Sequence, residues 1–176
     1  AAGQNMVTLA ANVACDYIKQ QTNHSFFLES NLNSDKKASF RNMILGRGHG
    51  VIAETHVTKS VMTRVLNVDQ DFLYESFNYF PIVSAMAGTH GNGLHISNAL
   101  TAIYLATGQD TACVAENSLG HFNLQKSDGG LTFRLTLPSL TIGTVGGGTR
   151  LNQQQQNLRL LGCDNGEHTS RKLAEI

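Results

Sequence analysis

Four ionisable residues stand out as candidates for chemistry. Asp35, Lys36 and Lys37 are consecutive in a polar loop, where an ammonium group could polarise a carbonyl and an adjacent carboxylate could tune its proton affinity. Asp110 lies between a helix-ending glycine and an apolar run, a position that favours a half-buried carboxylate with a shifted pKa. The residue types alone leave the alternatives open: a solvated loop for the first group, and a cap or turn carboxylate for Asp110.

A run of three glycines, Gly146 to Gly148, joins a predicted strand to a predicted helix. Free backbone N–H groups and the helix dipole at such a junction favour a phosphate or another anion. Glycine also serves wherever a tight turn needs a positive φ, so both readings stay open. The order of the glycines is not the G-x-G-x-x-G of a Rossmann fingerprint.

Several other kinds of site are not expected. The seven histidines show neither H-x-x-x-H nor H-E-x-x-H spacing, so we expect no metal site, and His95 is interpreted as a structural residue at a helix start. The G-x-S-x-G elbow of serine hydrolases and the Walker A motif are absent from the sequence. The three cysteines are scattered and odd in number, which favours reduced, mostly buried thiols in a cytosolic setting.

Composition excludes two classes of partner. Thirteen basic residues balance 13 acidic ones over 176 residues, without a basic patch for nucleic acid or anionic lipid. The longest mainly apolar stretch, residues 99–106, is far shorter than the roughly 20 residues that cross a bilayer. We therefore expect no nucleic-acid partner, no membrane segment in this stretch of chain, and a cytoplasmic location.

Helices and strands alternate irregularly along the chain, which predicts an α+β or α/β architecture. Apolar spacing and capping signals predict helices at 5–20, 58–66, 70–79, 95–107 and 150–161, the last capped by Thr149, and a further helix start at 169–176. Strands are predicted at 25–29, 51–57, 112–115, 131–137 and 140–145, with a turn at 127–130.

Six separate strings resemble the hydroxymethylglutaryl-CoA reductase family, in its order and near its spacings. They are SAMAG at 84–88; Asn98 with TAIY at 101–104 and GQD at 108–110; IGTVGGGT at 142–149; SDKK at 34–37; GRG at 46–48; and AAGQNM at 1–6, an edited form of the family's cofactor motif. The resemblance covers nearly the whole chain, and several independently placed motifs make it more specific than any single glycine loop.

The resemblance implies a four-electron reduction of a thioester to a primary alcohol, with two hydrides from NADPH and release of coenzyme A. Lys36 matches the family's catalytic lysine, which stabilises the oxyanion, and Asp110 matches the aspartate that lies against it. Further positions match binding residues of the family: for the substrate, Asp35, Lys37, Asn98 and Asn31; for the cofactor, Gly3, Gln4, Asn5, Val145 and Gly146.

The resemblance also implies a domain plan. Residues 1–28 would be the end of a small ferredoxin-like NADP-binding domain, 29–41 the loop with the catalytic lysine, and 42–176 a large mixed helix and strand domain for substrate and CoA. Active sites shared between subunits imply a homo-oligomer, a dimer or higher. The family's catalytic glutamate and histidine would lie before residue 1 and after residue 176, so we expect these 176 residues alone to be inactive.

Two positions depart from the family's pattern. Tyr79 stands where a substrate-binding lysine is expected, and Glu29 where a serine is expected. These changes remove a cation and add an anion near an acidic substrate. They leave two alternatives: a reductase of another CoA thioester, or a non-catalytic homologue that binds nucleotide or CoA.

Overall fold

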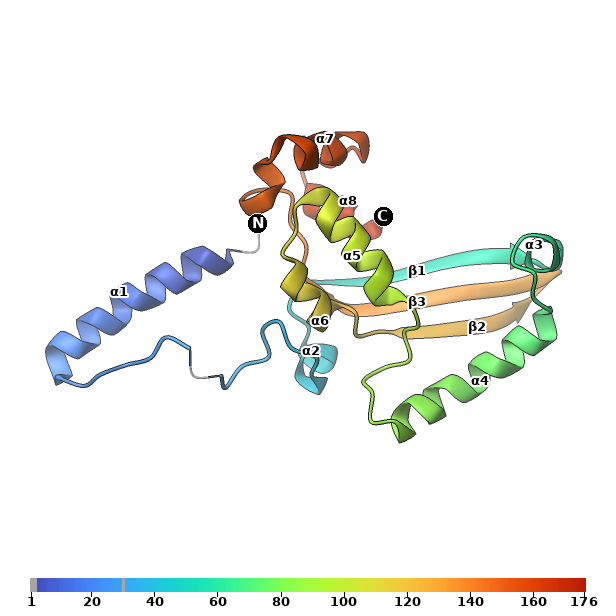
Figure 1. Ribbon diagram of the computed structural model, residues 1–176, viewed down its shortest axis with the longest axis horizontal. Helices are drawn as coiled ribbons and strands as arrows, with labels where there is room; N and C mark the ends of the chain where they lie inside the picture. Colours follow the sequence, from blue (N-terminus) through green and yellow to red (C-terminus); the bar gives the residue numbers. More distant parts are fainter. Residues whose placement is uncertain (1–2, 30) are drawn as a thin grey trace.

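The computed structural model describes residues 3–29 and 31–176 and contains a three-stranded antiparallel sheet (Figure 1). Its strands are β1 (His49–Thr58), β2 (His121–Ser127) and β3 (Gly130–Leu140), in the order β1-β3-β2. The helices are α1 (Gln4–Thr22), α2 (Phe40–Leu45), α3 (Lys59–Arg64), α4 (Gln70–Met86), α5 (Ile96–Thr107), α6 (Val114–Asn117), α7 (Asn152–Leu160) and α8 (Thr169–Glu175), with 3-10 turns η1 (Thr111–Cys113) and η2 (Gly147–Arg150). This mixture of helices and an antiparallel sheet agrees with the predicted α+β class.

Capping residues explain where several helices begin and end. The Thr58 side chain accepts a hydrogen bond from the Val61 N–H and starts α3, as predicted. The Asp69 side chain caps the start of α4 by accepting hydrogen bonds from backbone N–H groups of its first turn. This helix runs past its predicted end at residue 79 and through Pro81. Gly108, at φ 71°, ends α5 in the left-handed conformation that glycine adopts readily.

Three predicted strands are wrong. Residues 25–29 form no strand. Residues 112–115 are helical, because the Asp110 side chain accepts from the Ala112 N–H and starts η1, which continues into α6. Residues 140–145 are not a separate strand, since β3 continues to Leu140 and the chain then leaves the sheet.

The β2 strand was missed by the sequence pattern. It pairs with β3 from His121↔Thr136 to Ser127↔Gly130, so the predicted turn at 127–130 closes a hairpin. Its alternate residues Phe122 and Leu124 are the ones that lie inward, while the polar residues between them are more exposed. The signal was therefore present, but only two apolar positions carried it.

Two hydrophobic clusters lie at opposite ends of β3. One contains Met62, Leu124 and Leu131, with aromatic side chains of α4 packed against it. The other contains Leu137 and Leu140 and collects the buried faces of α5, α7 and α8. The second cluster is the platform beneath the candidate site.

The α1 helix stands apart from this platform (Figure 1). Within α1, whose residues are all described, no side chain is buried. Among the described helices, none is both long enough and apolar enough to cross a membrane. The predicted boundaries at residues 28 and 41 stay predictions.

Candidate active site

A lysine–aspartate ion pair joins the polar loop to the segment that follows α5. Lys36 Nζ lies 2.7 Å from Asp110 Oδ2, with side chains 39% and 40% exposed. The hydrogen bond to Asp110 raises the pKa of Lys36 above its ordinary value. The same bond holds the pKa of Asp110 below its usual range. Lys36 is therefore an ammonium at neutral pH, next to an ionised carboxylate.

The backbone of Lys36 is held in an unusual conformation. It has φ 55°, in a turn closed by the Lys37 N–H donating to the Ser34 carbonyl at 3.3 Å. The left-handed conformation costs a residue other than glycine about 1 kcal/mol or more, so neighbouring contacts must impose it. The Asn42 side chain donates to the carbonyls of Ser34 at 2.8 Å and Lys37 at 3.0 Å.

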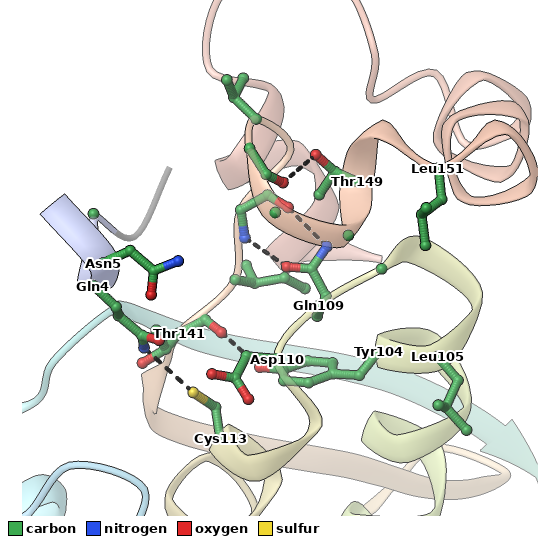
Figure 2. A pocket seen from close by; sticks show the side chains of 18 of the residues that line it. Gln4, Asn5, Tyr104, Leu105, Gln109, Asp110, Cys113, Thr141, Thr149 and Leu151 are labelled. Atoms are coloured by element: carbon green, nitrogen blue, oxygen red, sulfur yellow. Dashed lines mark hydrogen bonds between the residues drawn. The ribbon is translucent and has the colours of Figure 1, made fainter.

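A cavity of about 500 Å³ opens beside Asp110. Gln4 and Asn5, from the start of α1, lie on one side, and Gln109, Asp110 and Thr149 lie on the other (Figure 2). All five predicted cofactor residues line this cavity, namely Gly3, Gln4, Asn5, Val145 and Gly146. Folding thus brings together two segments about 140 residues apart in the sequence, and Asp110 lines the same cavity.

Close polar contacts fix the walls of the cavity. The Gln109 side-chain amide forms a pair of hydrogen bonds with the backbone of Gly143, in the way that two paired strands do. Its Nε2 donates to the Gly143 carbonyl at 2.7 Å, and its Oε1 accepts from the Gly143 N–H at 2.8 Å. The hydroxyl of the buried Tyr104 donates to the Thr141 carbonyl at 2.8 Å. Neither residue was assigned a role from the sequence beyond its place in a family motif.

The glycine run leaves room beside its backbone for part of a cofactor. Gly146 and Gly147 have φ 90° and 53°, and a Cβ built on either would meet no described atom within 4 Å. This open edge fits close approach by a ligand. The predicted cap is wrong, because the Thr149 hydroxyl donates to the Gly146 carbonyl at 2.6 Å and α7 begins only at residue 152. An anion at this junction stays a prediction.

The other predicted substrate residues are not all brought to the ion pair. Asp35 contacts the guanidinium of Arg47, and Lys37 Nζ donates to Asn33 at 2.9 Å. The Asn98 side chain bonds to the ring of His95 at 3.2 Å, at the start of α5. Asn31 has φ 61° and is exposed, and among the described residues neither it nor Asn98 lines the cavity.

The two departures from the family's pattern lie in different settings. The Glu29 carboxylate accepts from the Asn31 N–H at 2.6 Å and from the Asn33 side chain, so it organises the start of the lysine loop. Tyr79 lies on α4 with 66% of its surface exposed, and it is not among the described residues that line the cavity. Glu29 therefore has a local structural role, whereas Tyr79 has no described contact that explains it.

A buried carboxylate beneath the loop was not predicted from the sequence. Glu116 is fully buried in α6 and accepts a hydrogen bond from Arg47 Nη2 at 2.6 Å. Glu116 directly follows the residues predicted as a strand, 112–115, and no role was assigned to it from the sequence. Arg47 was named only as part of the GRG string at 46–48.

Comparison with known proteins identifies relatives along the whole chain. A family model described as hydroxymethylglutaryl-coenzyme A reductase matches residues 1–176. The 3-hydroxy-3-methylglutaryl-coenzyme A reductase of Methanocaldococcus jannaschii is 40% identical over 185 residues, covering 100% of this chain and 45% of the relative. The protein of the same name from Aspergillus terreus is 37% identical over 187 residues, covering 100% of this chain and 18% of the relative. The chain thus spans less than half the length of these relatives.

Proposed function

Because this chain belongs to the hydroxymethylglutaryl-coenzyme A reductase family, we propose that the intact protein reduces hydroxymethylglutaryl-CoA to mevalonate and CoA, with NADPH as the reductant. The observation that best supports this proposal is the Lys36–Asp110 ion pair, which lies beside a cavity lined by residues 3–6 and 145–149. An ammonium held by Asp110, a residue that lines this cavity, supports the proposal that the acyl carbonyl and the cofactor meet here.

Lys36 has the charge and exposure that the reaction requires. When the thioester carbonyl becomes an oxyanion, a preorganised ammonium stabilises the new charge by donating a hydrogen bond. The nicotinamide cofactor supplies the hydrides. Asp110 raises the pKa of Lys36 and holds its Nζ through the ion pair, and Asp110 is itself partly exposed.

The test is NADPH oxidation by a full-length protein that contains this chain, with hydroxymethylglutaryl-CoA present and then omitted. We expect substrate-dependent oxidation, with two NADPH consumed per CoA released. Lys36→Ala should abolish turnover and leave NADPH affinity within about threefold, because it removes the oxyanion contact and none of the residues that line the cavity.

A matched control is available elsewhere on the surface. Lys126 forms a similar ion pair with Asp71, 2.9 Å apart, between β2 and α4. Lys126→Ala should leave turnover unchanged. Unchanged turnover in Lys36→Ala would overturn the role proposed for Lys36.

A second candidate is reduction of a different CoA thioester, which Tyr79 favours because it replaces a cation with a neutral phenol. Turnover with other acyl-CoA thioesters, but not with hydroxymethylglutaryl-CoA, would establish it. Binding of NADPH or CoA without any turnover would instead indicate a non-catalytic homologue. In either case we propose a homo-oligomer whose active sites are shared between subunits. Measuring the mass of the full-length protein in solution tests this.

A further inference from the structure

Glu116 is a buried carboxylate whose bonding capacity is fully used. It has 0% exposure, and its two oxygens accept from Arg47 Nη2 at 2.6 Å, the Lys36 N–H at 3.2 Å, Asn42 Nδ2 at 3.3 Å and the Thr141 hydroxyl at 3.3 Å. A buried carboxylate is costly unless it is paired and hydrogen-bonded, and here both conditions are met.

Lys36 is held at both of its ends by one short segment. Asp110, which caps η1, binds its ammonium, and Glu116, in the following α6, accepts from its backbone N–H. The 3-10 turn and α6 are continuous, so the two carboxylates have a fixed separation. The side chain and the backbone of Lys36 are therefore positioned from the same rigid element.

We propose that Glu116 is a positioning residue for Lys36, fixing the strained backbone of the loop so that the ammonium meets Asp110 and the substrate. This inference rests on the proposed function for its consequence in turnover. Glu116 itself does not contact the substrate in this scheme; it acts through the Lys36 amide.

The contacts around the loop favour this role over simple charge balance. Pairing Arg47 would need only one carboxylate oxygen, and Oε1 receives that bond. The second oxygen, Oε2, faces the Lys36 N–H and Asn42, the side chain that also binds both ends of the Ser34–Lys37 turn. Since Lys36 has φ 55°, this oxygen stabilises a conformation that the loop would otherwise leave.

The decisive variant is Glu116→Gln in the full-length protein. The amide has the same shape but only one accepting oxygen, so it can satisfy Arg47 or the Lys36 N–H, but not both. Because Arg47 carries the charge, we expect the oxygen to face Arg47 and the amide group to face the Lys36 donor. We expect kcat to fall about 10- to 100-fold, with NADPH affinity within about threefold, since small misplacements of a catalytic group cost that much.

Leu131→Ala provides the control for general destabilisation. Leu131 is fully buried in the cluster at the other end of β3, so its truncation lowers stability without reaching the loop. It should lower the melting temperature while leaving kcat of the folded protein unchanged. If Glu116→Gln loses no more kcat than Leu131→Ala, the proposal is wrong.

Two readouts do not depend on catalysis. Hydrogen exchange of the Lys36 amide should be slow in the wild type and at least tenfold faster in Glu116→Gln, with β3 unchanged. Acylation of the Lys36 amine, which forms when the ammonium loses a proton, should also accelerate as the pairing with Asp110 loosens, and mass spectrometry follows it. If the wild type fails to reduce any CoA thioester, the proposed function fails, and these two measurements still decide the role of Glu116.

A second substitution serves if the Gln variant does not fold. Glu116→Asp keeps the buried charge for Arg47 but withdraws the oxygens by about 1.5 Å, one carbon–carbon bond. It should fold and show the same faster exchange at Lys36. Normal exchange together with normal turnover would overturn the proposal.

Discussion

At the scale of single residues, the Lys36–Asp110 pair makes its ammonium harder to deprotonate. We predict that Asp110→Asn lowers the pKa of Lys36, because the variant removes the hydrogen bond that raises it most. Acylation of Lys36 against pH should then reach half its maximum at a lower pH than in the wild type. Lys126 is the internal standard, since its partner Asp71 is untouched. An unchanged midpoint for Lys36 would show that Asp110 does not set its proton affinity.

The same pair makes stability depend on pH in a defined direction. The Lys36 contribution is complete below its ordinary pKa of 10.5 and is lost as pH rises through the raised value. The Asp110 contribution is complete above its ordinary pKa of 3.8 and is lost as pH falls through the lowered value. Both side chains are about 40% exposed, so solvent screening limits the pair to roughly 0.5 kcal/mol. Its importance is thus in placing Lys36 rather than in holding the fold.

At the scale of elements, the end of α5 packs directly against the glycine run. A Cβ on Gly108 would lie 2.3 Å from the Gly148 carbonyl oxygen, a contact that forces the two segments apart. We predict that Gly108→Ala destabilises the protein by about 2 kcal/mol more than Gly129→Ala, the usual size of an overpacking cost. Denaturant unfolding of both variants measures the difference.

Gly129 is the matched position because its backbone conformation is nearly the same. The two glycines have φ 71° and 69°, but a Cβ on Gly129 would meet no described atom within 4 Å. The cost of a positive φ is therefore shared, and only the clash differs. Gly108→Ala should also weaken NADPH binding, because it displaces residues 146–148. Equal destabilisation of the two variants would refute the close approach.

Elements with local signals were predicted well from the sequence. The apolar stripe of α1, the Thr58 cap and the Gly108 stop are set by neighbours within a few residues. Residues 112–115 were mistaken for a strand because their apolar run has no period of its own. What decides their helical state is the Asp110 cap, together with Glu116, whose charge needs donors from Lys36 and Arg47 far away in the sequence. Such pairings leave no trace in local periodicity.

At the scale of the whole molecule, the candidate site is built from segments at one end of the sheet, away from the cluster of Met62, Leu124 and Leu131 at the other end. The lysine loop, the 110–117 segment and the 141–149 segment converge at the end of β3 where Leu140 is buried. The motifs identified the segments but not how they meet. Their convergence required the register of β1 on β3, which places Gly48 against the Leu140 carbonyl and thereby brings Arg47 beneath the loop.

The α1 helix, unlike these segments, has an apolar face that is not packed against the sheet. Its apolar stripe is exposed, with Leu9 and Val13 at 65% and 69%, and its described side-chain contact with the core is Gln4 Nε2 to Cys113 Sγ at 3.5 Å. Most of the stability of a helix in a protein comes from packing of its apolar face, and the described apolar side chains of α1 are unpacked. In a protein of these 176 residues alone, we predict that the amides of residues 8–20 exchange within seconds, while β3, paired on both sides, exchanges far more slowly.

Hydrogen exchange with mass spectrometry checks this in the 176-residue protein and in the full-length one. If the apolar stripe packs against other parts of the full-length protein, α1 should be protected there and not in the shorter chain. Protection of α1 equal to that of β3 in the shorter chain would mean that the helix is stable without tertiary contacts. Because Gln4 and Asn5 line the candidate cofactor cavity, a mobile α1 would also weaken NADPH binding in the shorter chain. The same exchange experiment, repeated with NADPH, should then show protection appear first at residues 4–6.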